Sequence, residues 1–217
     1  MANRFVFLGP PGAGKGTQAV FVSEKLGIPA IATGAIFRGA ISKDTAMGKE
    51  VAQFVNSGLL VPDKLTNAVV AERLKEKDCK RGFILDGYPR SLVQAAALDA
   101  FLNKARTPLA AVLYFNVHAD IVIERMGKRR VCSQCATTYN LVSQPPKADG
   151  RCDKCGASLM TRVDDQPDSI RKRLDVYRTT TQPLLDYYEK KGVLKVLDAS
   201  QSVQAVAKEV TLICGVK

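Results

Sequence analysis

Short apolar runs alternate with amphipathic stretches along most of this chain. Five of the runs are almost continuously apolar, which is typical of parallel strands covered on both faces. They predict strands at residues 4–8, 28–32, 82–86, 110–117 and 193–198. The intervening stretches predict helices at about residues 14–26, 63–77, 91–104, 119–129, 168–190 and 202–213. Strand–helix alternation without an internal repeat predicts an α/β fold with an open, doubly wound parallel sheet.

Two segments interrupt this alternation. Residues 33–61 have the pattern of short helices and end in a turn-like Asn-Ser-Gly, whereas residues 128–165 hold four cysteines, Pro145-Pro146 and short strand-like pieces. Both segments fall between strands of the sheet, where small inserted domains are tolerated. We therefore expect one core that carries two inserts.

Two prolines bear on the last long helix. Pro167 stands where its first turn would begin, a position that suits proline. Pro183 lies inside the predicted helix 168–190, where proline removes a backbone hydrogen bond. The sequence therefore predicts a kink at Pro183 or a local compensation for it.

Length and composition exclude some classes of protein. A chain of 217 residues is long enough for one full core with small inserts. Its net charge of +11 favours anionic partners without choosing between nucleotides and nucleic acid. No apolar run approaches the roughly 18 residues of a membrane span, and the N-terminus lacks a signal-peptide pattern, so we expect a cytoplasmic protein. The single histidine, His118, argues against a histidine-dependent mechanism.

A glycine-rich loop, GPPGAGKGT at residues 9–17, follows the first predicted strand and opens the first helix. Its glycines let successive backbone N–H groups turn toward an anion, and the helix N-terminus adds positive potential. Lys15 supplies a full charge for the β and γ phosphates. Gly16 replaces the usual Ser or Thr, so we expect the loop not to grip magnesium directly. The pattern predicts a binding site for a nucleoside triphosphate.

A second phosphate-handling segment follows the strand at 82–86. Asp86 ends that strand, where a carboxylate is placed to hold magnesium through water. Arg90 at the same sheet edge indicates a second anion. Further arginines lie on the inserts or on the helices that border them: Arg38, Arg125, Arg129, Arg130, Arg162, Arg171 and Arg173. Phosphoryl transfer needs in-line positioning and cations around the transferred group, which such a site would supply as it closes and excludes water.

The four clustered cysteines form two C-x-x-C pairs, Cys132/Cys135 and Cys152/Cys155, separated by 16 residues. This spacing is typical of a four-thiolate zinc site. Four thiolates fill a tetrahedron and leave no open position for water or substrate, which argues against zinc catalysis. Disulfide pairing, redox sensing and iron binding remain as alternatives. Cys79 and Cys214 are isolated in sequence, and we expect them to be structural.

Several of these motifs together resemble the adenylate kinase family, in its long-lid bacterial form with a four-cysteine zinc lid. The matching segments are GPPGAGKGTQ (9–18), ATGAIFR (32–38), LDGYPRSLVQ (85–94), GKRRVC (127–132) and RVDDQPDSIRKRL (162–174). The resemblance implies a P-loop nucleoside monophosphate kinase fold with a five-stranded parallel sheet, and the reaction Mg-ATP + AMP ⇌ 2 ADP. It also implies a core of residues 1–31, 62–127 and 166–217, an AMP-binding insert at 32–61 and a lid at 128–165.

The resemblance further implies a role for each matching residue. The expected catalytic residues are Lys15, Asp86, Arg90, Arg129, Arg162 and Arg173. The expected ATP-binding residues are Gly12, Ala13, Gly14, Lys15, Gly16, Thr17, Arg125, Arg129, Thr138, Tyr139 and Gln201. The expected AMP-binding residues are Thr33, Arg38, Leu59, Leu60, Val61, Gly87, Tyr88, Pro89, Arg90, Gln94, Arg162 and Arg173, with Gln94 reading the adenine. Asp164 and Asp165 would orient lid arginines, and Cys132, Cys135, Cys152 and Cys155 would hold a structural zinc ion.

One position departs from the family pattern. The family usually has T-G-D-x-x-R where this chain has Thr33-Gly34-Ala35-Ile36-Phe37-Arg38. The missing carboxylate removes a polar contact that helps to organise the AMP insert. We expect altered closure or affinity rather than loss of activity, because Thr33 and Arg38 remain.

Two other functions were weighed against an adenylate kinase. The first is a kinase for another nucleoside monophosphate, although Gln94 and Thr33 favour AMP. The second is a P-loop ATPase that binds nucleic acid through a zinc ribbon, which would need aromatic residues interleaved with the basic patch. The chain has no Trp, and only Tyr139 and Tyr177 lie near that patch, so we expect no nucleic-acid partner. A monomer is the expected state, since no long apolar helix or heptad pattern is present.

Overall fold

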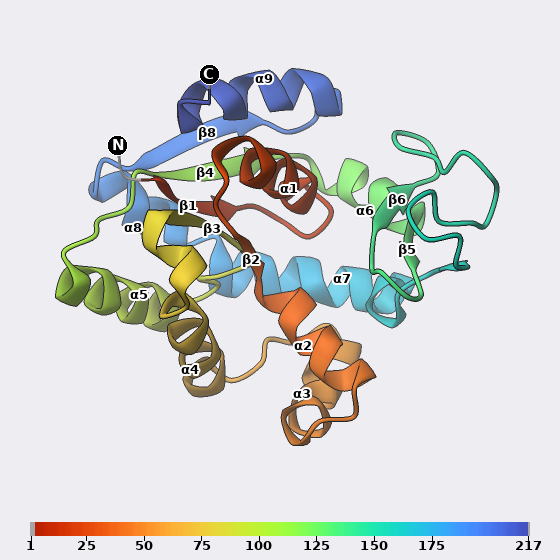
Figure 1. The fold of residues 1–217 in the computed structure, drawn as a ribbon, viewed down its shortest axis with the longest axis horizontal. Coiled ribbons are helices and arrows are strands. Elements are labelled where there is room, and N and C mark those ends of the chain that lie inside the picture. The colour runs from red at the N-terminus through yellow and green to blue at the C-terminus, as the bar shows by residue number, and fades with distance from the viewer. Residues whose placement is uncertain (1–2, 217) are drawn as a thin grey trace.

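The computed structural model describes residues 3–216, and its larger sheet is parallel with five strands in the order β2-β3-β1-β4-β8 (Figure 1). These strands are β1 (Asn3–Leu8), β2 (Ala30–Ala32), β3 (Gly82–Asp86), β4 (Ala111–Asn116) and β8 (Leu194–Asp198). The α/β fold class and all five predicted strands are therefore confirmed, although β2 is shorter than the predicted run. Residues 1, 2 and 217 of the predicted core lie outside the described residues.

Helices cover both faces of this sheet, as its continuously apolar strands require. On β1, Phe5 and Phe7 pack toward α1 (Lys15–Leu26) and α9 (Val203–Cys214). Val6 and Leu8 belong to the opposite core, which includes α4 (Asp63–Leu74), α5 (Leu92–Ala105) and α8 (Leu184–Lys190). All four β1 side chains are at most 3% exposed, so β1 is the buried centre of the molecule. The short helix η1 (Lys77–Arg81) leads into β3, and no helix within residues 3–216 is long and apolar enough to cross a membrane.

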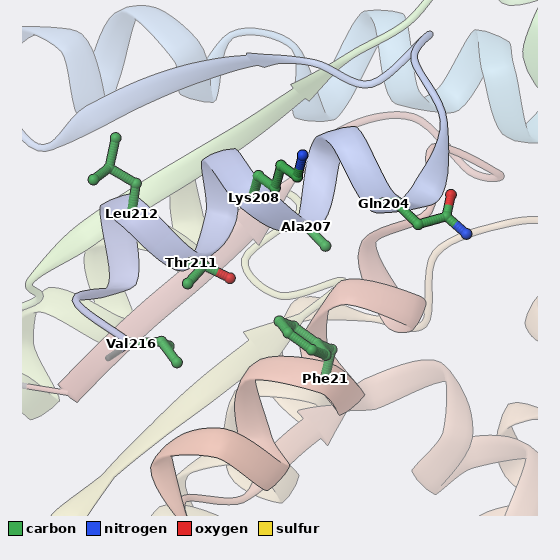
Figure 2. Close-up of a pocket in the computed structure, with 7 residues that line it drawn as sticks. All are labelled: Phe21, Gln204, Ala207, Lys208, Thr211, Leu212 and Val216. Atoms are coloured by element: carbon green, nitrogen blue, oxygen red, sulfur yellow. The ribbon is translucent and has the colours of Figure 1, made fainter.

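A shallow groove lies between α1 and α9 on the outer side of the sheet (Figure 2). Phe21 of α1 faces it from one side, and Ala207, Thr211 and Leu212 of α9 face it from the other. Leu212 is 83% exposed, so the groove is largely open to solvent. The residues that line it include none of those predicted to bind a nucleotide.

The helix predicted over residues 168–190 is present, and the predicted compensation for Pro183 is confirmed. The chain forms α7 (Pro167–Val176), a wide π-helical turn η3 (Tyr177–Thr181) and then α8. Within the wide turn the Gln182 N–H donates to the Tyr177 carbonyl over 2.9 Å, five residues back. This shifted pattern is the compensation that Pro183 needs, because proline has no N–H and its ring crowds the preceding turn.

The first insert is a pair of helices, α2 (Thr33–Ser42) and α3 (Ala46–Asn56), at the lower edge of the molecule in Figure 1. Phe37, Val51 and Val61 form a small apolar core of their own there. The two helices approach closely at Gly48, where an added Cβ would lie 2.2 Å from the Ala40 carbonyl oxygen. Packing therefore determines the shape of this insert.

The second insert projects at the other end, after α6 (Ala119–Gly127). It is a small antiparallel sheet in the order β6-β5-β7. Its strands are β5 (Arg129–Cys132), β6 (Thr138–Asn140) and β7 (Leu159–Met160), and the short helix η2 (Val163–Asp165) returns the chain to α7.

The parallel register brings three strand ends to one edge of the large sheet. Phe7 of β1 pairs with Asp86 of β3, and Leu8 of β1 pairs with Tyr114 of β4. The chain leaves β1 into the glycine-rich loop and leaves β3 into the segment 87–90. In open α/β sheets, ligands bind at this carboxyl edge.

Candidate active site

The glycine-rich loop at residues 9–17 turns at the carboxyl end of β1. Gly12 and Gly14 have φ angles of 77° and 89°, in the left-handed region that favours glycine. An added Cβ on Gly12 would lie 2.8 Å from Met126 Cγ, so the loop also approaches α6 closely. Helix α1 begins at Lys15 without a side-chain cap, which leaves N–H groups of its first turn for an anion.

The half-buried Lys15 side chain turns back toward this loop. Its Nζ donates hydrogen bonds of 2.8 Å to the carbonyl oxygens of Gly9 and Pro10. Burial lowers the pKa of the Lys15 ammonium to about 8; the Asp86 carboxylate opposes the shift, whereas Arg90 and other nearby arginines add to it. A phosphate anion would relieve this unfavourable burial of charge.

Asp86 lies against the loop beside Gly16, the residue that replaces the Ser or Thr of many phosphate loops. An added Cβ on Gly16 would lie only 3.1 Å from Asp86 Oδ2. Gly16 therefore makes room for the carboxylate, and a larger side chain would push it away. This arrangement suits a magnesium ion that the carboxylate holds from beside the loop.

Two buried aspartates organise the arginines above the loop. Asp165 accepts from both Nε and a terminal nitrogen of Arg129, and it lies 2.9 Å from Arg173 Nη1. Asp164 lies 3.1 Å from Arg173 Nη1 and 3.7 Å from Arg38 Nη1. Burial by itself raises the pKa of the Asp164 carboxyl, but the nearby charges of Arg173 and Arg38 outweigh burial and hold this pKa below its usual value. The predicted role of both aspartates in orienting arginines agrees with these contacts.

Arg162 and Arg90 complete the cationic group. Arg162 donates to Thr138 Oγ1 over 3.1 Å, while its buried Nε has no hydrogen-bond partner within residues 3–216. Burial, followed by repulsion from Arg129 and Arg38, lowers the pKa of Arg162 to about 9. The site thus gathers more positive than negative groups: Lys15, Arg38, Arg90, Arg129, Arg162 and Arg173 against Asp86, Asp164 and Asp165. Such an excess of buried cations suits a polyphosphate.

Next to these cations lies a pocket between the first insert and the sheet edge. Most residues predicted to bind AMP line it: Thr33, Arg38, Leu59, Leu60, Val61, Gly87, Arg90, Gln94 and Arg173. Tyr88, Pro89 and Arg162 are not among its lining residues. Tyr88 is buried in the core instead, with its hydroxyl 2.9 Å from Asn67 Oδ1. The Tyr88 side chain therefore belongs to the core rather than to the pocket.

The residues predicted to bind ATP have mixed surroundings. Arg125 donates to the carbonyl oxygens of Ala199 and Ser200, over 2.7 and 3.1 Å, and so ties the loop that carries Gln201 to α6. Tyr139 is buried in the second insert, where its hydroxyl accepts from the Asp153 N–H over 2.8 Å. The hydroxyl of Tyr139 is thus engaged inside the insert, and its contact with ATP stays a prediction.

The four clustered cysteines converge within the second insert. Their sulfur atoms all lie within 4.8 Å of one another, with Cys132 Sγ 3.4 Å from Cys155 Sγ and Cys135 Sγ 3.5 Å from Cys152 Sγ. Zinc–sulfur bonds of about 2.3 Å in a tetrahedron place the sulfurs about 3.8 Å apart. The cluster therefore fits a zinc ion. Four thiolates would complete the coordination of a zinc ion there. No position would then remain open on the metal for a substrate or a phosphate group.

Comparison with known proteins decides the family. The family model described as adenylate kinase matches residues 7–193. The chain is 52% identical to an adenylate kinase of Fervidobacterium nodosum over 97% of this chain and 96% of that protein. It is 49% identical to one of Thermotoga neapolitana (99% and 98%) and 47% identical to one of Archaeoglobus fulgidus (96% of each).

The chain belongs to the adenylate kinase family. Membership confirms the predicted P-loop nucleoside monophosphate kinase fold and the prediction of an enzyme of this family. It also favours an adenylate kinase over the alternative of a nucleic-acid-binding ATPase. Roles of single residues are a separate matter and stay predictions.

The departure from the family pattern at Ala35 can be located in this adenylate kinase. Ala35 lies on α2 and is exposed, and it is not among the residues that line the AMP pocket. An aspartate at position 35 would therefore carry its carboxylate on the solvent-exposed face of α2. The effect of Ala35 on closure of the insert or on affinity stays a prediction.

Sequence reasoning missed several residues of the site. Phe37 and Thr66 line the pocket, and Asp63 bonds to Gln94. Thr181, at the end of the wide turn η3, donates to the Arg90 carbonyl oxygen over 2.9 Å. Phe37 could have been predicted, because it is the sequence neighbour of Arg38. The other contacts join distant parts of the chain and leave no local signal in the sequence.

Proposed function

We propose that the protein catalyses reversible transfer of the terminal phosphoryl group of Mg-ATP to AMP, with two ADP molecules as products. The observation that carries this function is the position of the AMP pocket close to Lys15, since Arg90 and Arg173 both line the pocket and lie near enough to Lys15 to repel its charge. A phosphate oxygen of AMP forms the new bond to the γ phosphorus as the bond to the β–γ bridging oxygen breaks. The bridging oxygen leaves with the ADP product.

The basic side chains act by positioning and by electrostatic stabilisation. Lys15 and the first-turn N–H groups of α1 hold the β and γ phosphates, while Arg38 and Arg90 hold the AMP phosphate. Arg129, Arg162 and Arg173 surround the transferred group, whose equatorial oxygens carry the charge in the transition state. No side chain needs to form a covalent bond with the substrate.

The buried aspartates keep the arginines ready between turnovers. Asp164 and Asp165 pair with arginines that face the phosphate sites, so their carboxylates offset charge that a bound nucleotide would otherwise neutralise. Magnesium bound with ATP would be held near Asp86 and would screen negative charge on the phosphates.

The two inserts serve the two substrates in this proposal. Residues 32–61 form the AMP-binding insert and residues 128–165 the lid, while 1–31, 62–127 and 166–217 form the core. Closure of both inserts would exclude water and prevent hydrolysis of ATP. Zinc held by the four cysteines braces the lid and takes no part in the chemistry.

A single assay tests the function. ADP formation from ATP is followed with AMP, GMP, CMP or UMP as acceptor, and we expect AMP to be strongly preferred. Rapid consumption of ATP in the absence of any monophosphate would show a hydrolase instead. Sedimentation and cell fractionation test the expected monomer and the expected cytoplasmic location.

A further inference from the structure

Gln94 is the pocket residue whose hydrogen bonds are most completely fixed by the protein. It is 2% exposed and lines the AMP pocket. Its Oε1 accepts from the Arg90 backbone N–H over 2.7 Å, and its Nε2 donates to Asp63 Oδ1 over 2.7 Å. Each end of the amide thus has one partner in the protein.

These two partners allow only one orientation of the amide. If the amide were rotated by half a turn, its NH₂ group would face the Arg90 N–H, and its oxygen would face the Asp63 carboxylate. Two donors would then oppose each other at one end and two acceptors at the other. Unpaired polar groups of this kind are costly when buried.

Asp63 is itself held in place. Its Oδ2 accepts from Ser91 Oγ over 2.9 Å, and Ser91 Oγ in turn accepts from the Gln94 N–H as the cap of α5. Asp63 is also the first residue of α4, where the helix N-terminus favours a negative charge. The carboxylate is therefore a fixed acceptor rather than a mobile one.

The fixed amide has consequences for the base of the substrate. A primary amide has two acceptor positions on its oxygen and two donor hydrogens on its nitrogen. After the contacts to Arg90 and Asp63, Gln94 retains one acceptor and one donor in a set order. Adenine offers a donor at its 6-amino group beside an acceptor ring nitrogen, whereas a 6-oxo purine offers the reverse order.

We propose that Asp63 is a specificity-determining positioning residue, which locks the Gln94 amide in the orientation that pairs with 6-amino purines and rejects 6-oxo purines. This inference rests on the proposed function, in which Gln94 faces the base of the monophosphate. Asp63 itself touches no substrate; it acts only through Gln94.

The test compares AMP with inosine monophosphate (IMP) as acceptors. The two have nearly the same size and differ in the order of donor and acceptor on the edge that Gln94 reads. Asp63→Asn keeps the shape of the side chain but can offer Gln94 either an oxygen or an NH₂ group. Only the Arg90 N–H then still opposes the rotated amide, so that orientation becomes less costly. We expect the ratio of kcat/KM for AMP to that for IMP to fall about tenfold, within the range of one bidentate base contact.

Other measurements separate this role from a merely structural one. The KM for ATP should stay unchanged in Asp63→Asn, since the phosphate loop is untouched. Asp186→Asn is the matched control, because it removes an exposed carboxylate from the first turn of α8 and should leave the AMP-to-IMP ratio unaltered. In a Gln94→Leu background, Asp63→Asn should no longer change the ratio.

Each outcome decides something. A wild-type enzyme that prefers AMP, with an unchanged ratio in folded Asp63→Asn, overturns the role of Asp63 and leaves the proposed function intact. A wild-type enzyme that uses IMP as well as AMP overturns the lock without any variant, whereas one that phosphorylates neither overturns the proposed function as well. If Asp63→Asn does not fold, Asp63→Ala removes the same acceptor and must lower the ratio; an unchanged ratio in that variant also overturns the inference.

Discussion

The two inserts have similar tasks over the same active site, but different forces hold them together. The AMP insert has an apolar core of Phe37, Val51 and Val61, against which further apolar side chains pack. In the lid, the buried cluster is only Cys132, Tyr139 and Cys152, with two smaller apolar side chains beside it. A segment with so little apolar surface to bury needs another source of stability, which the four thiolates can supply with a metal ion. The comparison indicates that an insert with too small an apolar core of its own can rely on a metal site in place of packing.

The largest effect should come from the lysine of the phosphate loop, which belongs to neither insert. Lys15→Ala removes the full charge from the phosphate loop, so we expect kcat to fall by roughly a thousandfold or more, as for other charges that stabilise a phosphoryl-transfer transition state. Steady-state assay of ADP formation measures this. Metal content and Tm should stay close to those of the wild type, because neither insert depends on Lys15. A near-normal kcat would contradict the assignment of the phosphate loop.

Removing the metal should affect the lid alone. Cys132→Ser combined with Cys135→Ser leaves two thiolates, so we expect loss of the bound metal and a loss of stability on the order of several kcal/mol. Elemental analysis and thermal unfolding measure both, and kcat at low temperature should survive. Cys79→Ala removes a buried thiol outside the lid and should retain the metal. A folded double variant without activity would show that the metal is not merely structural.

Packing should matter in the AMP insert in the way that metal matters in the lid. Val51 is fully buried, so Val51→Ala should cost about 2 kcal/mol and raise the KM for AMP more than the KM for ATP. The matched control is Val142→Ala in the lid, where the side chain is 64% exposed and neither constant should change. Equal effects of the two substitutions would mean that the AMP insert does not depend on its apolar core.

The smallest effect should be a pH dependence of kcat/KM for ATP, caused by Lys15 in the phosphate loop. The lowered pKa of Lys15, about 8, means that its ammonium is charged below this pH and neutral above it. Because the charged form binds phosphate, kcat/KM for ATP should be halved near pH 8 and should fall further as the pH rises. A profile that stays flat between pH 7 and pH 9 would contradict this role of Lys15. Metal content should not change over the same range.

The elements that could be predicted from the sequence are those with local patterns. Each apolar strand, the phosphate loop and the paired cysteines occupy a few adjacent residues, and their spacing alone indicates what they do. The order of the strands in the sheet was not predicted, and neither was the form of the compensation inside the helix at 168–190. Pro183 signalled that something must change there, but the wide turn that results became visible only in three dimensions.

What the sequence by itself determined is therefore the chemistry available: a phosphate loop, many arginines, two carboxylates at Asp164 and Asp165, and a four-thiolate site. The tertiary structure decided which of these groups meet. Arg129 reaches Asp165 across 36 residues, Gln94 reaches Asp63 across 31, and Thr181 reaches Arg90 across 91. Contacts of this range depend on how strands and helices pack, and packing is a property of the whole chain that no short motif contains.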